Sequence, residues 1–323
     1  MKSNSRRVVQ LYDLKQSPFF GLKSKRDLSA LLRVGIPQLR NLLRAQEADL
    51  YTEISIKKKG ELVLRKDGSP RLAEVPRSAL RQIHNRLLVL LTRILVPKYV
   101  HCSVKDRSYI TNARAHKGAG TSIVLDLRRF YPSTTLSHIS DCFGRIFCCS
   151  PDVAFAIAKL CTYRGHLPTG SCISGRLSYY AHKEIFDRLS TEALRRGLTL
   201  TLYMDDLAIS GDRGVREFAQ LVKLELRRVG LDYREEGCFR CGQPKTITGV
   251  IVTEKKIALP NRRHQAIIKC LLRWQKSADP DERSKLAAEL LGRLGEADQI
   301  DPLIRGRITN RFYLPALRGM EKA

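Results

Sequence analysis

Three aspartates carry the clearest chemical signal in the sequence. Asp205 and Asp206 are adjacent and lie between the apolar stretches 200–203 and 207–209, while Asp126 lies in a separate apolar stretch. Carboxylates among apolar neighbours are costly unless a partner neutralises them. Mg²⁺ prefers carboxylate oxygens and substrate phosphates, and two such ions can activate an attacking hydroxyl and stabilise a leaving oxygen. These residues favour metal-dependent phosphoryl transfer, although an isolated Asp-Asp pair is also common at solvated turns.

The predicted elements must bring these carboxylates together. Residues 198–210 read as two short strands that meet at the acids, and an antiparallel neighbour at 121–127 would carry Asp126 to the same edge. We also expect a hairpin of 51–56 with 61–65 and a strand at 246–252. Long amphipathic helices are predicted at 77–95, 174–196 and 214–230, with a mostly helical tail from about 260. Strands and helices mix without regular alternation, which predicts an α+β fold.

The charge of the chain indicates a polyanionic partner. Lys and Arg total 58 against 32 Asp and Glu, a net charge of +26 spread along all 323 residues. Such a surplus repels itself unless a polyanion neutralises it, which favours nucleic acid. The sequence has neither an apolar run of about 18 residues nor the apolar segment of a secretory signal, so we expect a cytoplasmic protein that does not contact a membrane.

The cysteines predict no metal site. There are nine, an odd number at irregular spacings, which indicates reduced thiols. Only Cys238 and Cys241 have the spacing of metal ligands, and a structural zinc site needs two further ligands.

Around the aspartates the sequence resembles reverse transcriptases, and among them the bacterial retron type. "YMDD" has the Tyr-x-Asp-Asp pattern of these enzymes, and "LDLRRFYPSTT" resembles their first catalytic block. "LPTGSCISG" is similar to the second block, and "RLAEVP" resembles a block of the fingers. "NARAH" and "ITGVIV" resemble two elements of retron enzymes. These six blocks cover roughly residues 60–255 in the family's order.

The resemblance implies a right-hand polymerase with fingers, palm and helical thumb. Residues 1–120 would form the N-terminal helices and fingers. Residues 121–235 would form the palm, an antiparallel sheet with helices, with a fingers insertion at about 138–168. Residues 236–323 would form the thumb and an RNA-binding region.

The resemblance also implies roles for residues that match the family's blocks. Asp126, Asp205 and Asp206 would be the catalytic ligands of two Mg²⁺ ions. The nucleotide side would consist of Arg71 at the triphosphate, the Leu127 backbone beside the metals, Tyr131 as the group that excludes a ribose 2′-hydroxyl, and Gly170 at the nascent base pair. The RNA-binding side would include Asn112, His116, Thr248 and Gly249.

Several of these positions have a structural alternative. Tyr131 and His116 could be core residues, Gly249 a strand irregularity, and Arg71 a solvated charge with Arg65 and Lys66 as competitors. Two departures from the family pattern stand out in the second block, where Thr169 replaces the usual glutamine and Gly175 a frequent proline. No lysine clearly matches the family's general acid, and Lys245 and Arg234 are the possible substitutes.

The expected function is that of a retron reverse transcriptase. Such an enzyme copies part of a bound structured noncoding RNA into DNA from deoxynucleoside triphosphates. The family implies priming from an internal RNA 2′-hydroxyl, a branched RNA–DNA product and antiphage defence with a separately encoded effector protein. The alternatives are another bacterial reverse transcriptase, of the group II intron or diversity-generating type, and a catalytically silent RNA-binding scaffold.

Overall fold

The computed structural model describes residues 10–58, 60–64, 68–118 and 120–311. The amino-terminal half contains η1 (Leu14–Gln16), α1 (Lys25–Leu32), α2 (Ile36–Arg44), α3 (Glu47–Leu50), β1 (Tyr51–Ser55), β2 (Lys57–Lys58), β3 (Glu61–Leu62), β4 (Leu72–Pro76), α4 (Ser78–Thr92), α5 (Tyr109–Ala115), β5 (Thr121–Arg128), α6 (Phe130–Ser133), α7 (Leu136–Asp141), the π-helix η2 (Cys142–Ile146) and α8 (Pro151–Cys161). The carboxyl-terminal half contains α9 (Ser174–Ala181), α10 (Lys183–Arg195), β6 (Thr199–Tyr203), β7 (Asp206–Gly211), α11 (Val215–Arg228), β8 (Asp232–Phe239), β9 (Lys245–Ile247), β10 (Val250–Val252), β11 (Ile257–Ala258), α12 (Asn261–Lys276), α13 (Pro280–Ile300) and α14 (Ile304–Arg311).

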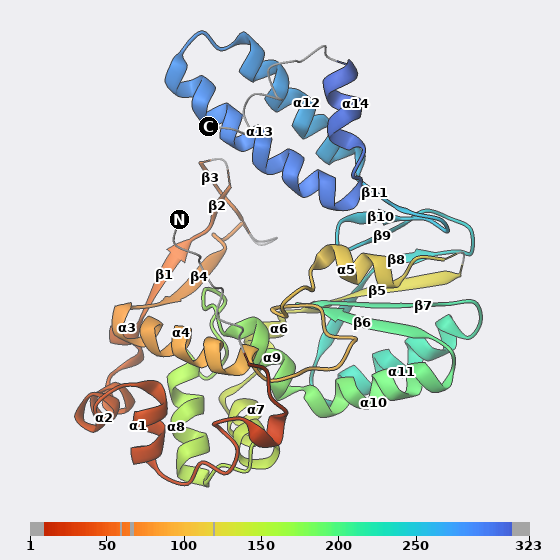
Figure 1. The fold of residues 1–323 in the computed structure, drawn as a ribbon. Helices are drawn as coiled ribbons and strands as arrows, with labels where there is room; N and C mark the ends of the chain where they lie inside the picture. Colours follow the sequence, from red (N-terminus) through yellow and green to blue (C-terminus); the bar gives the residue numbers. More distant parts are fainter. Residues whose placement is uncertain (1–9, 59, 65–67, 119, 312–323) are drawn as a thin grey trace.

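The main sheet is antiparallel, with the strand order β6-β7-β5-β8. Helices α10 and α11 lie along one side of it, and α5 lies on the other (Figure 1). Two-stranded sheets β1-β4 and β2-β3 and a three-stranded sheet β11-β10-β9 complete the strands. This mixture of helices with antiparallel sheets confirms the α+β prediction.

Each face of the main sheet contributes to a different hydrophobic core. Leu125 of β5 and Leu207 of β7 belong to the larger core, together with buried residues of α10, α11 and the amino-terminal helices. Val124 and Ala208, one residue away on the same strands, belong to a second core with α5, β9–β10 and helices α12–α14. Successive side chains of a strand point to opposite faces, which explains this division.

Three predicted elements differ from the observed ones. In place of the expected hairpin of 51–56 with 61–65, the structure has the short β2-β3 pair and a backbone hydrogen bond from Val63 to Ile56, because β1 pairs along its whole length with β4. The predicted strand 246–252 is a hairpin of β9 and β10, which turns at Thr248 and Gly249, where φ is +45° and +74°. Positive φ at both central residues is typical of tight hairpin turns.

The predicted helix 174–196 is divided at His182. The backbone there has φ −111° and ψ 18°, and the buried His182 ring lies 3.2 Å from the Thr134 hydroxyl. Neither glycine nor proline marks this break, so the apolar periodicity continues through it.

All nine cysteines are free thiols. Over the described ranges, no helix has both the length and the apolar character needed to cross a membrane.

Candidate functional site

The three aspartates converge at the end of the main sheet where β5 leads into α6. Asp126 of β5 lies directly opposite Asp206, the first residue of β7. Asp205 precedes it in the turn after β6, and the Leu127 amide donates a 2.8 Å hydrogen bond to the Asp205 carbonyl. One carboxylate oxygen from each aspartate lies within 4.8 Å of the other two. In the described part of the chain this is the one group of three or more His, Cys, Asp or Glu side chains that could hold a metal ion.

Strand alternation aims the carboxylates at one face. Leu125, Leu127 and Leu207 point into the larger core, so Asp126 and Asp206 point to the opposite face. Met204 adopts a left-handed backbone, with φ +56°, and this conformation forms the tight turn before the acids. The apolar neighbours therefore bury the strands while the carboxylates stay partly or fully exposed.

The carboxylates form a strongly negative site in a basic protein. Two full charges near 4.8 Å repel by about 3 kcal/mol at an effective dielectric constant of about 20. The Arg234 guanidinium from the neighbouring strand β8 lies 3.4 Å from the Asp126 carboxylate and is half exposed. Three clustered carboxylates with an open approach match the oxygen ligands that Mg²⁺ prefers.

Of the two substitutes for the general-acid lysine, Arg234 lies at the trio and Lys245 does not. Lys245 is buried, and its Nζ donates to the carbonyl of Gly120, just before β5 begins. Asp126 lies near the other end of the same strand. Burial lowers the pKa of Lys245 from its ordinary value.

Tyr131 lies between the core and the acids. Its ring packs against the larger core, and its centroid lies 6.0 Å from that of Phe130. Burial raises the pKa of its hydroxyl, with smaller contributions from nearby groups that include Asp205. A Cβ on Gly175 would lie only 3.4 Å from the Tyr131 hydroxyl oxygen, so the small residue at 175 leaves room for the phenol.

Arg71 and Gly170 both lie next to β4: Arg71 directly precedes the strand, and Gly170 packs against its middle. Arg71 is exposed, and its backbone is hydrogen-bonded to the backbone of Ile56 and of Val63. The Gly170 amide donates to the Glu74 carbonyl at 3.1 Å, and a Cβ on Gly170 would lie 2.8 Å from that oxygen. Glycine at 170 is thus required by the close approach to β4. Its predicted place at a nascent base pair is a separate expectation.

Asn112 and His116 point into the protein. His116 Nδ1 lies 2.7 Å from the Ser210 hydroxyl, and Nε2 lies 2.7 Å from the Thr201 hydroxyl. Burial, with nearby Lys245 and His101, lowers the pKa of His116 to about 3. The side-chain amide of Asn112 is fully buried and has no hydrogen-bond partner among the described residues. Neither side chain is at a surface that RNA could contact, so any part in RNA binding would be indirect.

Thr248 and Gly249 connect the β9-β10 hairpin to α5. The Thr248 hydroxyl donates to the carbonyl of Tyr109 at 2.8 Å. A Cβ on Gly249 would lie 3.3 Å from the Arg262 guanidinium, so the turn also approaches α12 closely. The "ITGVIV" block therefore contacts α5, the helix that carries most of the "NARAH" block.

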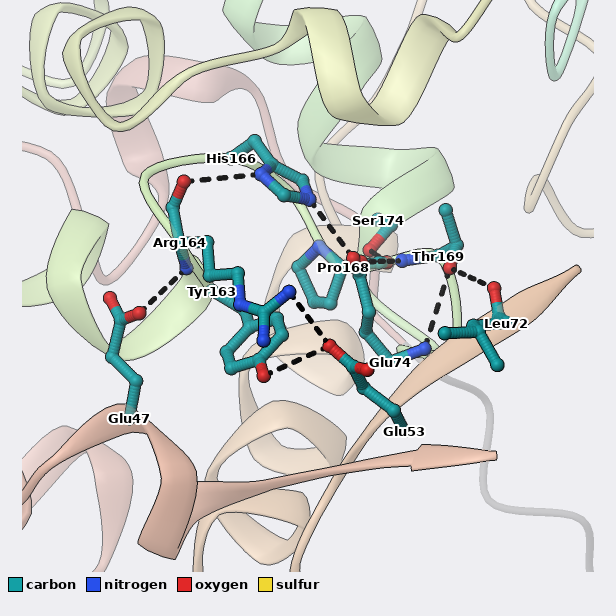
Figure 2. Close-up of polar contacts among 10 residues, drawn as sticks. All are labelled: Glu47, Glu53, Leu72, Glu74, Tyr163, Arg164, His166, Pro168, Thr169 and Ser174. Carbon is teal, nitrogen blue, oxygen red and sulfur yellow. Dashed lines mark hydrogen bonds and ion pairs between the residues drawn. The ribbon is translucent and has the colours of Figure 1, made fainter. Parts of the chain in front are cut away.

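The sequence offers no reason to single out Glu74 as a residue that organises the region around the site. It stands inside the "RLAEVP" block, and its carboxylate contacts His166 and the Thr169 amide (Figure 2). These partners are 92 and 95 residues away, and no spacing in the sequence could reveal them.

No protein-family profile matches the chain. The retron Se72 reverse transcriptase of Salmonella heidelberg is 29% identical over 156 residues, which cover 46% of this chain and 40% of that protein. The retron Mx65 enzyme of Myxococcus xanthus is 27% identical over 316 residues, covering 82% and 70% of the two chains. The retron Ec86 enzyme of Escherichia coli is 23% identical over 246 residues, covering 75% of each. The chain is therefore similar to several proteins named retron reverse transcriptases, and it spans less than half the length of the first of them.

Proposed function

We propose that this protein is a retron-type, RNA-directed DNA polymerase. The observation that carries the proposal is the convergence of Asp126, Asp205 and Asp206, with oxygens within 4.8 Å of one another. Similarity to proteins named retron reverse transcriptases supports the same activity. The matched region covers 40% of the retron Se72 enzyme and 70% and 75% of the other two relatives.

The trio would hold two Mg²⁺ ions. When bound, such ions lower the pKa of an attacking hydroxyl and stabilise the leaving oxygen of phosphoryl transfer. Asp126 and Asp206 would present oxygens from a rigid strand pair, and Asp205 would add one from the turn. Arg234 would supply positive charge beside the carboxylate of Asp126, but a guanidinium does not give up its proton at physiological pH.

The nucleotide would approach from the side of Arg71, Tyr131 and the Leu127 backbone. The exposed Arg71 suits phosphate oxygens as a charged donor. The neutral phenol of Tyr131 would fill the space that a ribose 2′-hydroxyl needs. Gly170 would keep the neighbouring loop close to β4.

The architecture that fits this activity is a right hand. Residues 1–120, with the β1-β4 sheet, would be the fingers, and 121–235, with the trio, the palm, including an insertion at about 138–168. Residues 236–323, with α12–α14, would form the thumb and the RNA-binding region. Thr248 and Gly249, with Asn112 and His116 beneath, would shape the surface between palm and thumb.

The partner would be a structured noncoding RNA that serves as template. The net charge of +26 suits a polyanion that remains bound. The retron resemblance leads us to propose priming from an internal 2′-hydroxyl, a branched RNA–DNA product, a location in the bacterial cytoplasm and antiphage defence with a separate effector protein.

The test is primer extension by the purified protein with its copurified RNA, Mg²⁺ and deoxynucleoside triphosphates. We expect DNA that resists separation from RNA until a 2′-debranching enzyme is added. DNA synthesis on an ordinary primer without a 2′ linkage would favour another class of bacterial reverse transcriptase. Tight RNA binding without incorporation on any template would favour the silent scaffold.

A further inference from the structure

Two glutamates face each other on the β1-β4 sheet. Glu53 of β1 is directly opposite Glu74 of β4, so both side chains lie on the same face of the sheet. Like charges at directly opposed positions destabilise a strand pair. The side chains are 30% and 16% exposed, so solvent screens them only in part. This carboxylate pair needs partners.

One loop supplies partners for both carboxylates. Residues 163–170, between α8 and α9, cross the face of the sheet (Figure 2). The Arg164 guanidinium lies 3.0 Å from Glu53, which also accepts a 3.2 Å hydrogen bond from the Tyr163 hydroxyl. His166 Nε2 lies 3.1 Å from Oε1 of Glu74, and the amide of Thr169 donates to Oε2 at 3.0 Å.

The backbone completes the attachment of this loop. The Thr169 hydroxyl donates to the Leu72 carbonyl at 3.3 Å, and the Gly170 amide donates to the Glu74 carbonyl at 3.1 Å. At the other end, the Ser174 hydroxyl donates to the carbonyl of Pro168 at 2.6 Å and joins the loop to α9. Thr169 thus directs its side chain to β4, where the resembled family has a glutamine.

The loop leads directly to the residue beside the acids. Five residues after Gly170, Gly175 lies in α9 against the hydroxyl of Tyr131. A displacement of the loop would therefore move the groups that surround Tyr131. Glu74 touches neither the trio nor, in our proposal, the nucleotide.

We propose that the contacts of Glu53 and Glu74 with loop 163–170 set the spacing between β4 and the main sheet, and thereby position the incoming deoxynucleoside triphosphate. Glu74 is then a positioning residue. This inference rests on the proposed polymerase function. Glu74 is the more important of the two glutamates, because both its oxygens and its backbone carbonyl hold the loop.

The test is steady-state incorporation by the full-length protein bound to its RNA, with deoxynucleotide concentration varied. Glu74→Ala removes the contacts of the carboxylate with both His166 and the Thr169 amide, so the KM for the deoxynucleotide should rise at least about tenfold while kcat changes by less than about threefold. Glu74→Gln keeps an acceptor for the Thr169 amide and should restore part of the loss. Glu61→Gln, an exposed glutamate of β3, is the matched control and should change neither constant.

A double-mutant cycle separates positioning from general damage. Glu74→Gln and His166→Gln should raise KM less in combination than the product of their separate effects, because they remove the same contact. If Glu74→Ala does not fold, this milder cycle decides the question. If the two substitutions raise KM by the product of their separate effects, or if KM is unchanged in Glu74→Ala, the positioning inference is wrong. The proposed polymerase function would still stand in that case, provided that the wild-type protein is active. An inactive wild-type protein would overturn both.

Discussion

Polar side chains on one face of the main sheet are buried and paired at one end of the strands, and are exposed and negatively charged at the other. At one end, the hydroxyls of Ser210 and Thr201 are buried beneath α5, and both are hydrogen-bonded to His116. At the other end, Asp126 and Asp206 stand on the same strand face within 4.8 Å of each other. At the covered end, the His116 ring is hydrogen-bonded to both of these hydroxyls, and buried hydrogen bonds of this kind stabilise a fold. The open end concentrates like charge, which calls for cations and substrate.

The largest expected effect is at the open end. Asp205→Asn removes one metal ligand, and we expect DNA synthesis to fall at least about a thousandfold, since bound metal supplies several kcal/mol of transition-state stabilisation. RNA affinity and the free energy of unfolding should change little, because the residue is exposed. Asp212→Asn, an exposed acid beyond the other end of β7, is the matched control. Comparable synthesis by Asp205→Asn and wild type would remove the metal assignment.

A substitution at the covered end should reduce stability and leave DNA synthesis nearly unchanged. His116→Ala leaves two buried hydroxyls without their partner, and we expect the free energy of unfolding to fall by about 2–4 kcal/mol. Chemical denaturation measures this loss. Synthesis by the molecules that remain folded should stay within a few fold of wild type, because the partners of His116 are four residues along the strands from the acids, Ser210 after Asp206 and Thr201 before Asp205. A stable but inactive His116→Ala would show that the two ends are not separable.

A third change tests the border of the open end. Tyr131→Ala removes the phenol beside Asp205, and discrimination against ribonucleotides should weaken by on the order of tenfold. Competition between a deoxynucleotide and its ribonucleotide in primer extension measures the ratio. Tyr131→Phe, which keeps the ring, should retain most of the selection. Unchanged sugar selection in Tyr131→Ala would leave Tyr131 as a core residue only.

The smallest effect is a pH dependence that belongs to the covered end. Burial lowers the pKa of His116 to about 3, whereas the unfolded chain has an ordinary value near 6.5. Between these values the unfolded state binds the additional proton, so the stabilisation is complete above about pH 6.5 and is lost as pH falls. The expected loss is about 1.4 kcal/mol per pH unit for this histidine.

Denaturation of wild type and His116→Gln at pH 7, 6 and 5 measures that slope. The substitution should reduce it by about one proton. Equal slopes in the two proteins would mean that His116 does not titrate as its burial requires.

The same comparison shows which features of the fold and of the site could be predicted from the sequence. The acids were predictable because strand alternation and an adjacent Asp pair are local patterns, and the register of β5 with β7 confirmed that they meet. For His116 the sequence left a core position as the alternative to RNA binding, and the structure shows the core position; the sequence could not decide because the partners lie 94 and 85 residues away. The helix break at His182 was not predicted for the same reason: a contact with the distant Thr134 accompanies it, and no helix-breaking residue marks it.

The pairing of β1 with β4 and the contacts of Glu74 also depend on packing between distant segments. Local periodicity favoured the nearer partner of β1 and gave no sign of the loop that covers the glutamates.

The most direct test of the central claim is a crystal structure with Mn²⁺ in place of Mg²⁺, an RNA–DNA substrate and an unreactive deoxynucleotide analogue, examined by anomalous scattering. We predict two peaks about 4 Å apart, with oxygens of Asp126, Asp205 and Asp206 as ligands. An ordered substrate with manganese elsewhere, and none between these carboxylates, would contradict the account.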